Sequence, residues 1–287
     1  MILIKRLISL TKPGIIFGNL ITVAAGFFLG CRGGHIHYGL LLLALLGSTL
    51  IIASGCVFNN YIDRDIDRLM ERTKNRVLAL GLVPPYRALF YAIILGCLGT
   101  LILVHINHLT ASIAIIGLFF YVVVYSLWCK RGSIYGTLIG TISGSTPPVI
   151  GYCAATNHLD LGALILFLIL STWQMPHSYA IGIYRMQDYK AANIRLLPIV
   201  KGIATTKWHM LGYIVLFIIA TLLLPIFHYT GMIYFIVALI LGIGWLQLAI
   251  RGFYTKNDVI WAKKMFGFSI ICITVLSITM SLNAIHI

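Results

Sequence analysis

Nine long apolar runs dominate this sequence of 287 residues and limit what it can fold into. Each is close to the roughly 20 apolar residues that a helix needs to cross the hydrocarbon core of a bilayer. They lie near residues 14–31, 38–60, 87–105, 109–128, 137–154, 161–182, 210–228, 231–250 and 264–284. Strands of a membrane barrel would be shorter and would alternate apolar with polar residues. The sequence therefore predicts one all-α domain over residues 1–287, a polytopic membrane bundle of about nine helices.

The amino-acid composition is typical of a protein that lies in a lipid bilayer. Hydrophobic residues make up 60% of it and charged residues only 10%, whereas a soluble domain is about half apolar and about a quarter charged. The formal net charge is +14, which in a soluble protein would suggest a nucleic-acid partner. The meaning of that charge therefore depends on where along the chain the basic residues lie.

The basic residues fall almost entirely on one side of the predicted bundle. With nine crossings, 20 of the 21 Lys and Arg residues lie on the side of the N-terminus, and only Arg32 lies on the other. Positive charge is retained on the cytoplasmic side of a membrane, which predicts a cytoplasmic N-terminus and a C-terminus on the periplasmic or outer side. Topology thus explains the basic excess, and no nucleic acid is expected.

The stretch "NNYIDRDIDRLMERTKNR", residues 59–76, holds four of the seven acidic residues. Asn59, Asp63, Asp67 and Glu71 follow one another at intervals of four residues, so on a helix they form a stripe along one face. Asp65 falls about 200° away from Asp63 and points elsewhere, and the role of Glu71 stays open. An amide and two carboxylates are hard oxygen ligands of the kind that Mg²⁺ takes together with water and substrate phosphates. The basic residues that follow suit phosphate oxygens.

Three other interpretations of this stretch were considered. It could be a solvated loop with incidental ion pairs. It could imitate a calcium-binding loop, but Arg68 stands where that loop needs Gly, and Lys74 where it needs Glu. An intramembrane phosphotransferase that acts on nucleotide-activated alcohols also carries Asp-xxx-Asp, but the Asp-Gly…Ala-Arg element that precedes it there is absent here.

A second charged patch, "YRMQDYKAANIRLLPIVKG", covers residues 184–202. Its one acid, Asp188, is flanked by Arg185, Lys190 and Arg195. This patch and residues 59–76 both follow spans that end on the same membrane face. We therefore expect the two patches to converge on one diphosphate.

The aspartate stripe followed by "ERTKNR" resembles the first aspartate-rich motif of the intramembrane aromatic prenyltransferase superfamily. Four further stretches resemble the haem-farnesylating branch of that superfamily. They are "LTKPGIIFGNLIT" (10–22), "YSLWCKR" (125–131), "SGSTPPVIGY" (143–152) and "WQMPHSYAIGIYRMQDY" (173–189). It covers the chain nearly end to end. One position departs from the superfamily, because Tyr184-xxx-Asp188 stands where Asp-xxx-Asp is usual, and this leaves a second metal ion short of a carboxylate.

The resemblance implies an Mg²⁺-dependent transferase of the bacterial inner membrane, with its active site facing the cytoplasm. Farnesyl would pass from farnesyl diphosphate to a vinyl group of haem B, with addition of water, giving haem O and diphosphate. The product serves terminal oxidases or becomes haem A, so a haem A synthase or an oxidase is the expected protein partner. The residues expected at the metal and in catalysis are Asn59, Asp63, Asp67 and Asp188. Those expected at the diphosphate are Arg72, Lys74, Arg76, Tyr125, Lys130, Arg131 and Lys190.

The haem side rests on fewer residues. His177 is the one histidine of nine that lies well inside a predicted span, so we expect it to contact haem, together with Trp173 and Gln174. Whether it ligates iron, holds a propionate or activates water is open. Pro147 and Pro148 are expected to break the fifth span.

A secondary transporter is the alternative from another class, because buried charges and broken helices are also typical of transporters. It would place ionisable groups near the midplane and show inverted repeats. Here the charges cluster at the cytoplasmic ends of the spans and no repeat is evident, so the sequence favours the transferase.

Overall fold

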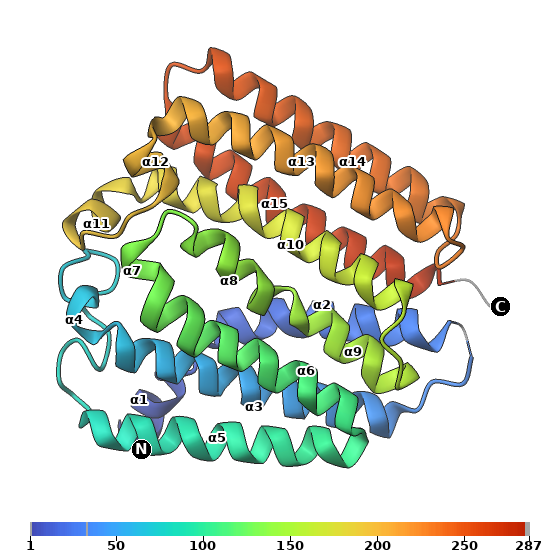
Figure 1. The fold of residues 1–287 in the computed structure, drawn as a ribbon, viewed down its shortest axis with the longest axis horizontal. Helices are drawn as coiled ribbons and strands as arrows, with labels where there is room; N and C mark the ends of the chain where they lie inside the picture. Colours follow the sequence, from blue (N-terminus) through green and yellow to red (C-terminus); the bar gives the residue numbers. More distant parts are fainter. Residues whose placement is uncertain (1, 33, 285–287) are drawn as a thin grey trace.

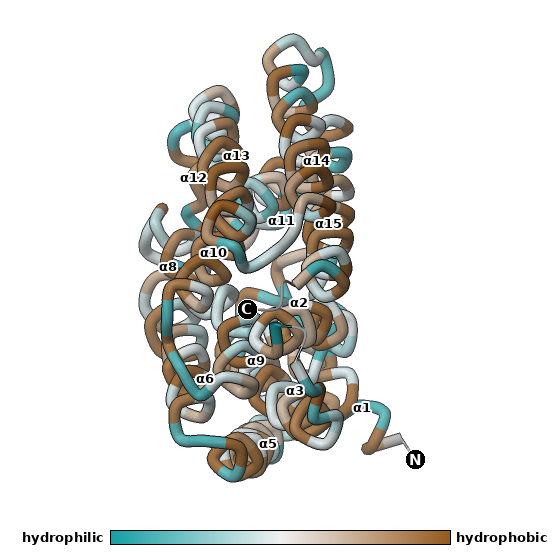
Figure 2. The backbone as a smooth tube through the Cα atoms, turned by 90° about the vertical axis from the view of Figure 1, so that its right-hand side faces the viewer, coloured by the Kyte–Doolittle hydropathy of each residue, from teal (hydrophilic) through white to brown (hydrophobic). Residues whose placement is uncertain are grey.

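The computed structural model describes residues 2–32 and 34–284, which form helices and connecting loops without a β-strand. Eight segments are long and apolar enough to cross a membrane. They are α2 (Pro13–Cys31), α3 (Tyr38–Ile62), α5 (Pro85–Ile106), the continuous segment His108–Gly132, α10 (Leu161–Tyr184), α13 (Gly202–Ile226), the segment Met232–Tyr254 that contains α14 (Met232–Arg251), and α15 (Asp258–Leu282). Figure 2 shows apolar residues along the helices and hydrophilic ones mostly in the connections. The prediction of an all-α polytopic membrane protein is confirmed.

The remaining predicted span, residues 137–154, is formed by two short helices. α8 (Gly136–Gly144) and α9 (Thr146–Thr156) follow each other across the bundle in Figure 1. Ser145, between them, has φ −97° and ψ −7°, and Pro147 and Pro148 occupy the first turn of α9, where a missing N–H does least harm. The predicted break is confirmed. With this pair as one crossing, the described chain has the predicted number of spans.

The continuous segment His108–Gly132 changes its helical type on the way to the charged end. It runs as α6 (His108–Phe119), a π-helix (Phe120–Cys129) and the single turn α7 (Lys130–Gly132). π-helical stretches are rare and are frequent at functional sites. No sequence pattern predicted this one.

Four short helices surround the ends of the long ones: α1 (Ile2–Leu10), α4 (Arg64–Asp67), α11 (Met186–Ala191) and α12 (Leu197–Val200). α4 and α11 lie beside each other at one end of the bundle (Figure 1). Ile66 and Met70 pack there against Ala192 and Ile194 in a small apolar cluster. The two charged patches, far apart in sequence, therefore meet as predicted.

Two glycines bring α2 and α9 into backbone contact. A Cβ added to Gly26 would lie 1.9 Å from the carbonyl oxygen of Pro148, and one added to Gly151 would lie 1.9 Å from that of Val23. α3 packs along α5, and α10 along α13 and α15. The close α2–α9 contact thus joins the first span to the broken one.

Asp160, the residue directly before α10, has a structural role. Its carboxylate caps α10 by accepting from the backbone N–H groups of Gly162 (2.9 Å) and Ala163 (3.2 Å), and it also accepts from the hydroxyl of Tyr152 (2.9 Å). Such a cap satisfies N–H groups that the helix itself leaves without partners.

Candidate active site

Burial separates three residues of the predicted stripe from Asp65. Asn59, Asp63 and Asp67 are 4%, 0% and 2% exposed, whereas 60% of the Asp65 side chain is exposed. α3 ends at Ile62, and Asp63 (φ −86°, ψ 1°) joins it to the single turn of α4. The chain stays close enough to helical geometry that Asp63 and Asp67 both turn inward and Asp65 turns outward.

Asp63 is held on one oxygen and leaves the other without a partner. Its Oδ2 accepts from Nδ2 of Asn59 (2.7 Å) and from the ammonium of Lys130. Its Oδ1 is buried and has no hydrogen-bond partner among the described residues. A buried acceptor without a partner is costly, so this oxygen is suited to receive a cation.

Asp67 is held by a bidentate pair with Arg76. Nη1 of Arg76 donates to both carboxylate oxygens of Asp67, at 2.9 and 2.8 Å. The hydroxyl of Thr73 donates to the backbone carbonyl of Asp67 (3.0 Å) and closes the loop between them. Arg76, the last of the basic residues that follow the stripe, therefore folds back onto Asp67.

The π-helix supplies the third wall of this site. Ser126 Oγ donates to the carbonyl oxygen of Tyr121 (2.8 Å), five residues earlier, and lies 3.3 Å from Nδ2 of Asn59. Tyr125 stacks on Tyr121 with ring centroids 6.0 Å apart. Lys130, directly after the π-helix, reaches Asp63. The predicted residues Tyr125 and Lys130 thus lie at the stripe.

Lys12 is a site residue that the sequence reasoning missed. It precedes Pro13 at the start of α2 and has a left-handed backbone (φ 53°, ψ 69°). Its Nζ donates to Oδ1 of Asn59 at 2.7 Å. Burial, together with the nearby charges of Arg76 and Lys130, lowers the pKa of the Lys12 ammonium to about 8, against the opposing effects of Cys56 and Asp63. A basic residue directly before the first apolar run, within "LTKPGIIFGNLIT", was the available signal.

Asp188 lies at the edge of the site and does not complete a cluster of acids. Its Oδ1 accepts from the backbone N–H of Glu71 (3.1 Å), which ties α11 to the loop after α4. The part of the chain that the structure describes contains no group of three or more His, Cys, Asp or Glu side chains placed to hold a metal ion. Among the described residues, Asp188 therefore contacts the loop after α4 and does not lie in one cluster with Asp63 and Asp67.

Tyr189, next to Asp188, is a second residue that was missed. Burial raises the pKa of its phenol, and Tyr125 adds to that effect, while the charges of Arg72 and Lys130 oppose it. Its side chain packs against the apolar cluster of Ile66, Met70, Ala192 and Ile194. A tyrosine that follows the only acid of a charged patch carried no distinguishing signal in the sequence.

Arg131 was predicted to contact the diphosphate. In the structure its side chain pairs with Asp65, the acid that faces outward. Its two terminal nitrogens donate to the two carboxylate oxygens of Asp65, both at 2.7 Å. These hydrogen bonds hold the pKa of the Asp65 carboxyl at about 2. A cleft of about 440 Å³ opens beside the pair, with Tyr61, Arg64 and Ser126 in its lining.

The other predicted phosphate ligands lie on the surface of the same end. Lys74 pairs with Glu71 at 2.6 Å, and both side chains are exposed. Arg72 and Lys190 are exposed as well. Glu71, whose role was open, thus belongs to a surface ion pair and lies outside the buried stripe.

His177 stands between two aromatic rings inside the bundle. Its ring centroid lies 4.6 Å from that of Trp173 and 4.9 Å from that of Phe266. Its Nδ1 lies 2.7 Å from the hydroxyl oxygen of Ser269 on α15. The indole N–H of Trp173 donates to the backbone carbonyl of the same Ser269 (2.8 Å). Trp173 and His177 therefore form one unit with α15.

Gln174 faces a different neighbour. A Cβ added to Gly144, the last residue of α8, would lie 2.0 Å from Oε1 of Gln174. This oxygen is buried and has no hydrogen-bond partner among the described residues. The Gln174 amide therefore lies at the break between α8 and α9, and its oxygen is able to accept a hydrogen bond.

Residues 19–271 match the UbiA prenyltransferase family. The chain belongs to the UbiA prenyltransferase family.

Full-length relatives within the UbiA family are similar over almost the whole chain. Protoheme IX farnesyltransferase of Yersinia enterocolitica is 57% identical over 282 residues, which cover 98% of this chain and 95% of the relative. The protein of that name from Photorhabdus laumondii is 57% identical and is covered to 96%.

Solved structures of the UbiA family share the fold. A digeranylgeranylglyceryl phosphate synthase superposes with a TM-score of 0.82 at 23% identity, over 99% of both chains. A UbiA homologue from Archaeoglobus fulgidus, bound to GPP and Mg²⁺, gives 0.66 at 14% identity, over 96% of this chain and 99% of that one. At these identities the likeness concerns the fold alone.

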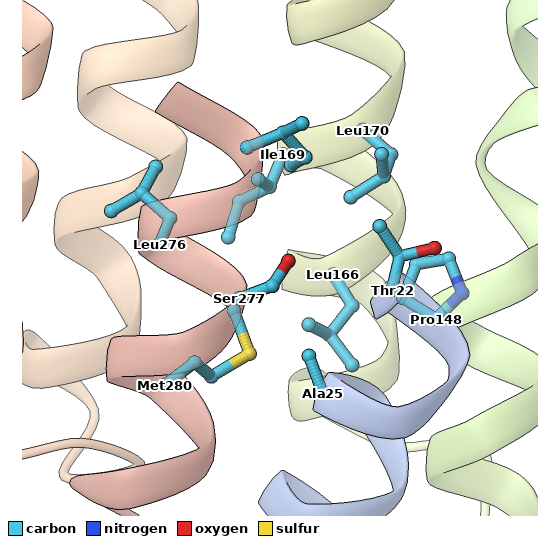
Figure 3. Close-up of a pocket in the computed structure, with 10 residues that line it drawn as sticks. Thr22, Ala25, Pro148, Leu166, Ile169, Leu170, Leu276, Ser277 and Met280 are labelled. Carbon is cyan, nitrogen blue, oxygen red and sulfur yellow. The ribbon is translucent and has the colours of Figure 1, made fainter. Parts of the chain in front are cut away.

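This UbiA family member also contains a narrow apolar crevice deeper in the bundle. It lies between α2, α9, α10 and α15 (Figure 3). Ala25, Leu166 and Met280 line it together with other apolar side chains, and Thr22 and Ser277 add two hydroxyls. Its lining suits hydrocarbon.

Proposed function

We propose that this chain transfers the farnesyl group of farnesyl diphosphate to a vinyl group of haem B, with addition of water, to give haem O and diphosphate. The observation that carries the proposal is the buried set of Asn59, Asp63 and Asp67 beneath Lys130 and Arg76. It occurs in a chain that is 57% identical to protoheme IX farnesyltransferases over nearly its full length. A secondary transporter is not favoured, because the charged groups gather at one end of the bundle.

The residues present fit a divalent cation. Asp63 offers a buried carboxylate oxygen without a partner, and Asn59 and Asp67 add the oxygen donors that Mg²⁺ prefers. Asn59, Asp63 and Asp67 would hold Mg²⁺, and Asp188 on α11 would serve a second ion. When bound, the ion supplies a Lewis acid where charge develops on the diphosphate.

The basic residues neutralise the acids until substrate arrives and then serve the diphosphate. Lys12, Arg76 and Lys130 already contact the stripe. They aim preorganised positive charge at the leaving group, which is the most effective form of electrostatic stabilisation. Arg72, Lys74, Arg131 and Lys190 at the rim, with Tyr125 beside Lys130, complete the proposed diphosphate contacts.

The bonds exchanged follow from this arrangement. The C1–O bond of farnesyl diphosphate breaks, and its electron pair leaves with the diphosphate. The π electrons of the haem vinyl group form the new bond to C1. The positive charge then left on the carbon next to the porphyrin is taken by the lone pair of water, which loses one proton. No protein nucleophile is needed.

The two organic substrates need apolar space. The farnesyl tail, which is pure hydrocarbon, is proposed to lie between apolar helices that are open to the bilayer. Haem B is proposed to contact His177, Trp173 and Gln174. The aromatic rings of Trp173 and Phe266 around His177 support a flat apolar substrate there.

The chain is an integral multi-pass membrane protein. We place it in a bacterial inner membrane with the N-terminus and the active site on the cytoplasmic side, because 20 of its 21 basic residues cluster at that end. A haem A synthase or a terminal oxidase is the proposed recipient of the product.

Identification of the reaction product tests the proposed function. Membranes that contain the chain are incubated with haem B, farnesyl diphosphate and Mg²⁺, and the pigments are analysed by mass spectrometry. We expect haem B to gain one farnesyl group and one hydroxyl group, because the water that adds loses one proton. Haem B that returns unchanged, while another aromatic acceptor is prenylated, would leave the family assignment standing and remove haem as the substrate.

A further inference from the structure

The hydroxyl of Ser269 lies between two groups and has only one proton to give. Its Oγ lies 2.6 Å from the backbone carbonyl oxygen of Phe266 and 2.7 Å from Nδ1 of His177. A carbonyl oxygen can only accept. Two oxygens at 2.6 Å need a hydrogen between them, so the Ser269 proton points to Phe266.

The tautomer of His177 follows from that assignment. Because the Ser269 proton is committed, the hydroxyl oxygen can only accept from His177, and Nδ1 of His177 must carry a hydrogen. In a neutral imidazole one nitrogen is a donor and the other an acceptor. Nε2 is then the nitrogen with the free lone pair, and the structure gives it no hydrogen-bond partner among the described residues.

The ring is also fixed in direction. Trp173 stacks on the ring and Phe266 packs against it at a tilt, with centroids at 4.6 and 4.9 Å, so the ring cannot swing without losing these contacts. The indole N–H of Trp173 donates to the backbone carbonyl of Ser269, which ties the position of the serine to the same helix, α10. Ser269 holds the Nδ1 side of the ring, so Nε2 is the nitrogen that remains for a ligand, and its direction is fixed with the ring.

This arrangement is the one that metal-bound histidines have. A ligating histidine almost always donates its other ring N–H to a fixed acceptor, which sets its tautomer and direction. A bare Nε2 also cannot donate to a propionate, so the neutral ring does not suit a carboxylate. We propose that Nε2 of His177 ligates the iron of haem B during farnesyl transfer, and that Ser269 is the positioning residue that holds it in this tautomer.

The inference rests on the proposed function, since haem B is the substrate that it assigns. It goes further by naming the atom that binds the iron and a residue, Ser269, that no sequence motif singled out. His177 lies seven residues before the end of α10 at Tyr184, which is about 10 Å of helix rise. Haem held there is anchored within the bundle, inward of the end where the diphosphate binds.

Optical and resonance Raman spectra of haem B bound to the full-length protein in lipid nanodiscs, without farnesyl diphosphate, test the proposal. We expect the wild type to show a histidine-ligated iron. His177→Ala should lose that signature and regain it with added imidazole. His209→Ala removes an exposed histidine on α13 and should leave the spectrum unchanged. If His177→Ala gives the wild-type spectrum, the proposal is overturned.

Ser269→Ala separates positioning from folding. Loss of such an acceptor typically lowers metal affinity by 10–100-fold, so we expect haem affinity to fall about tenfold and the iron–histidine stretching frequency to shift. Ser269→Thr, which keeps the hydroxyl, should restore both. An unchanged frequency in Ser269→Ala would overturn the tautomer assignment.

The product assay on the same preparations distinguishes failure of the proposed function from failure of the iron-ligand assignment. If the wild type farnesylates haem but His177→Ala leaves the spectra unchanged, the proposed function is retained and the assignment of His177 as iron ligand is wrong. If the product of His177→Ala lacks the added water and its spectrum is normal, the ring activates water, which also overturns the ligand. A wild type that binds haem through His177 but transfers no farnesyl group removes the proposed function.

Discussion

Arg76 holds both carboxylate oxygens of Asp67, at 2.9 and 2.8 Å, in a pair in which the acid is 2% exposed. Breaking a buried pair by removing one partner is far more damaging than replacing both, because a lone charge stays buried. We expect Arg76→Gln to lower the free energy of unfolding by about 3 kcal/mol, measured by denaturant titration in detergent.

The double variant is the matched control for that pair. Asp67→Asn combined with Arg76→Gln removes both charges, so it should recover most of the lost stability but none of the farnesyl transfer. A single Arg76→Gln variant as stable as the wild type would show that the pair does not hold the loop.

Lys12 should make diphosphate binding depend on pH. Its pKa is lowered to about 8 in the free protein, and a bound anion favours the charged form. Affinity for farnesyl diphosphate, measured in EDTA by calorimetry, should be greatest below pH 8 and should fall as the pH rises above it. Lys12→Arg, which stays charged, should remove this fall.

The same shift has a consequence for stability. Between the lowered value of about 8 and the ordinary 10.5, the unfolded chain binds a proton that the folded chain does not. The contribution of Lys12 to the free energy of unfolding therefore rises with pH across this window, and Lys12→Met should abolish that slope. A slope unaffected by Lys12→Met would contradict the assignment.

The α2–α9 contact should tolerate no side chain at Gly26. A Cβ there meets the carbonyl oxygen of Pro148 at 1.9 Å, so the helices must separate, and overpacking of this kind costs about 1–3 kcal/mol. Gly18→Ala, on the same helix with nothing within 4 Å of the new carbon, should be neutral or slightly stabilising. Thermal unfolding of the two variants side by side makes the comparison.

Much of the fold was predictable because lipid imposes simple rules. Apolar length gave the spans, and Pro147 and Pro148 gave the break. Helical phase put Asp63 and Asp67 on one side and Asp65 on the other, since α3 and α4 continue nearly as one helix through Asp63. Local periodicity carries such information across a single element.

The partners of these residues were not predictable, because they depend on contacts between elements. The π-helix brings Lys130 to Asp63 while Arg131, one residue later, pairs with Asp65. Lys12 enters the site from a different span. Asp188 meets the backbone of Glu71 instead of joining the other acids. Residue type and spacing identified the cations as a group but not which of them reach the stripe.

The rates of farnesyl transfer by Asp63→Asn, Asp67→Asn and Asp65→Asn, compared in one membrane preparation with Mg²⁺, test the central claim most directly. The loss of a group that stabilises charge in the transition state costs about 10²–10³ in rate, so the first two variants should fall at least that far. Asp65→Asn, which alters only the exposed pair with Arg131, should stay within about tenfold of the wild type. Equal losses at all three positions would contradict an active site built on the buried acids.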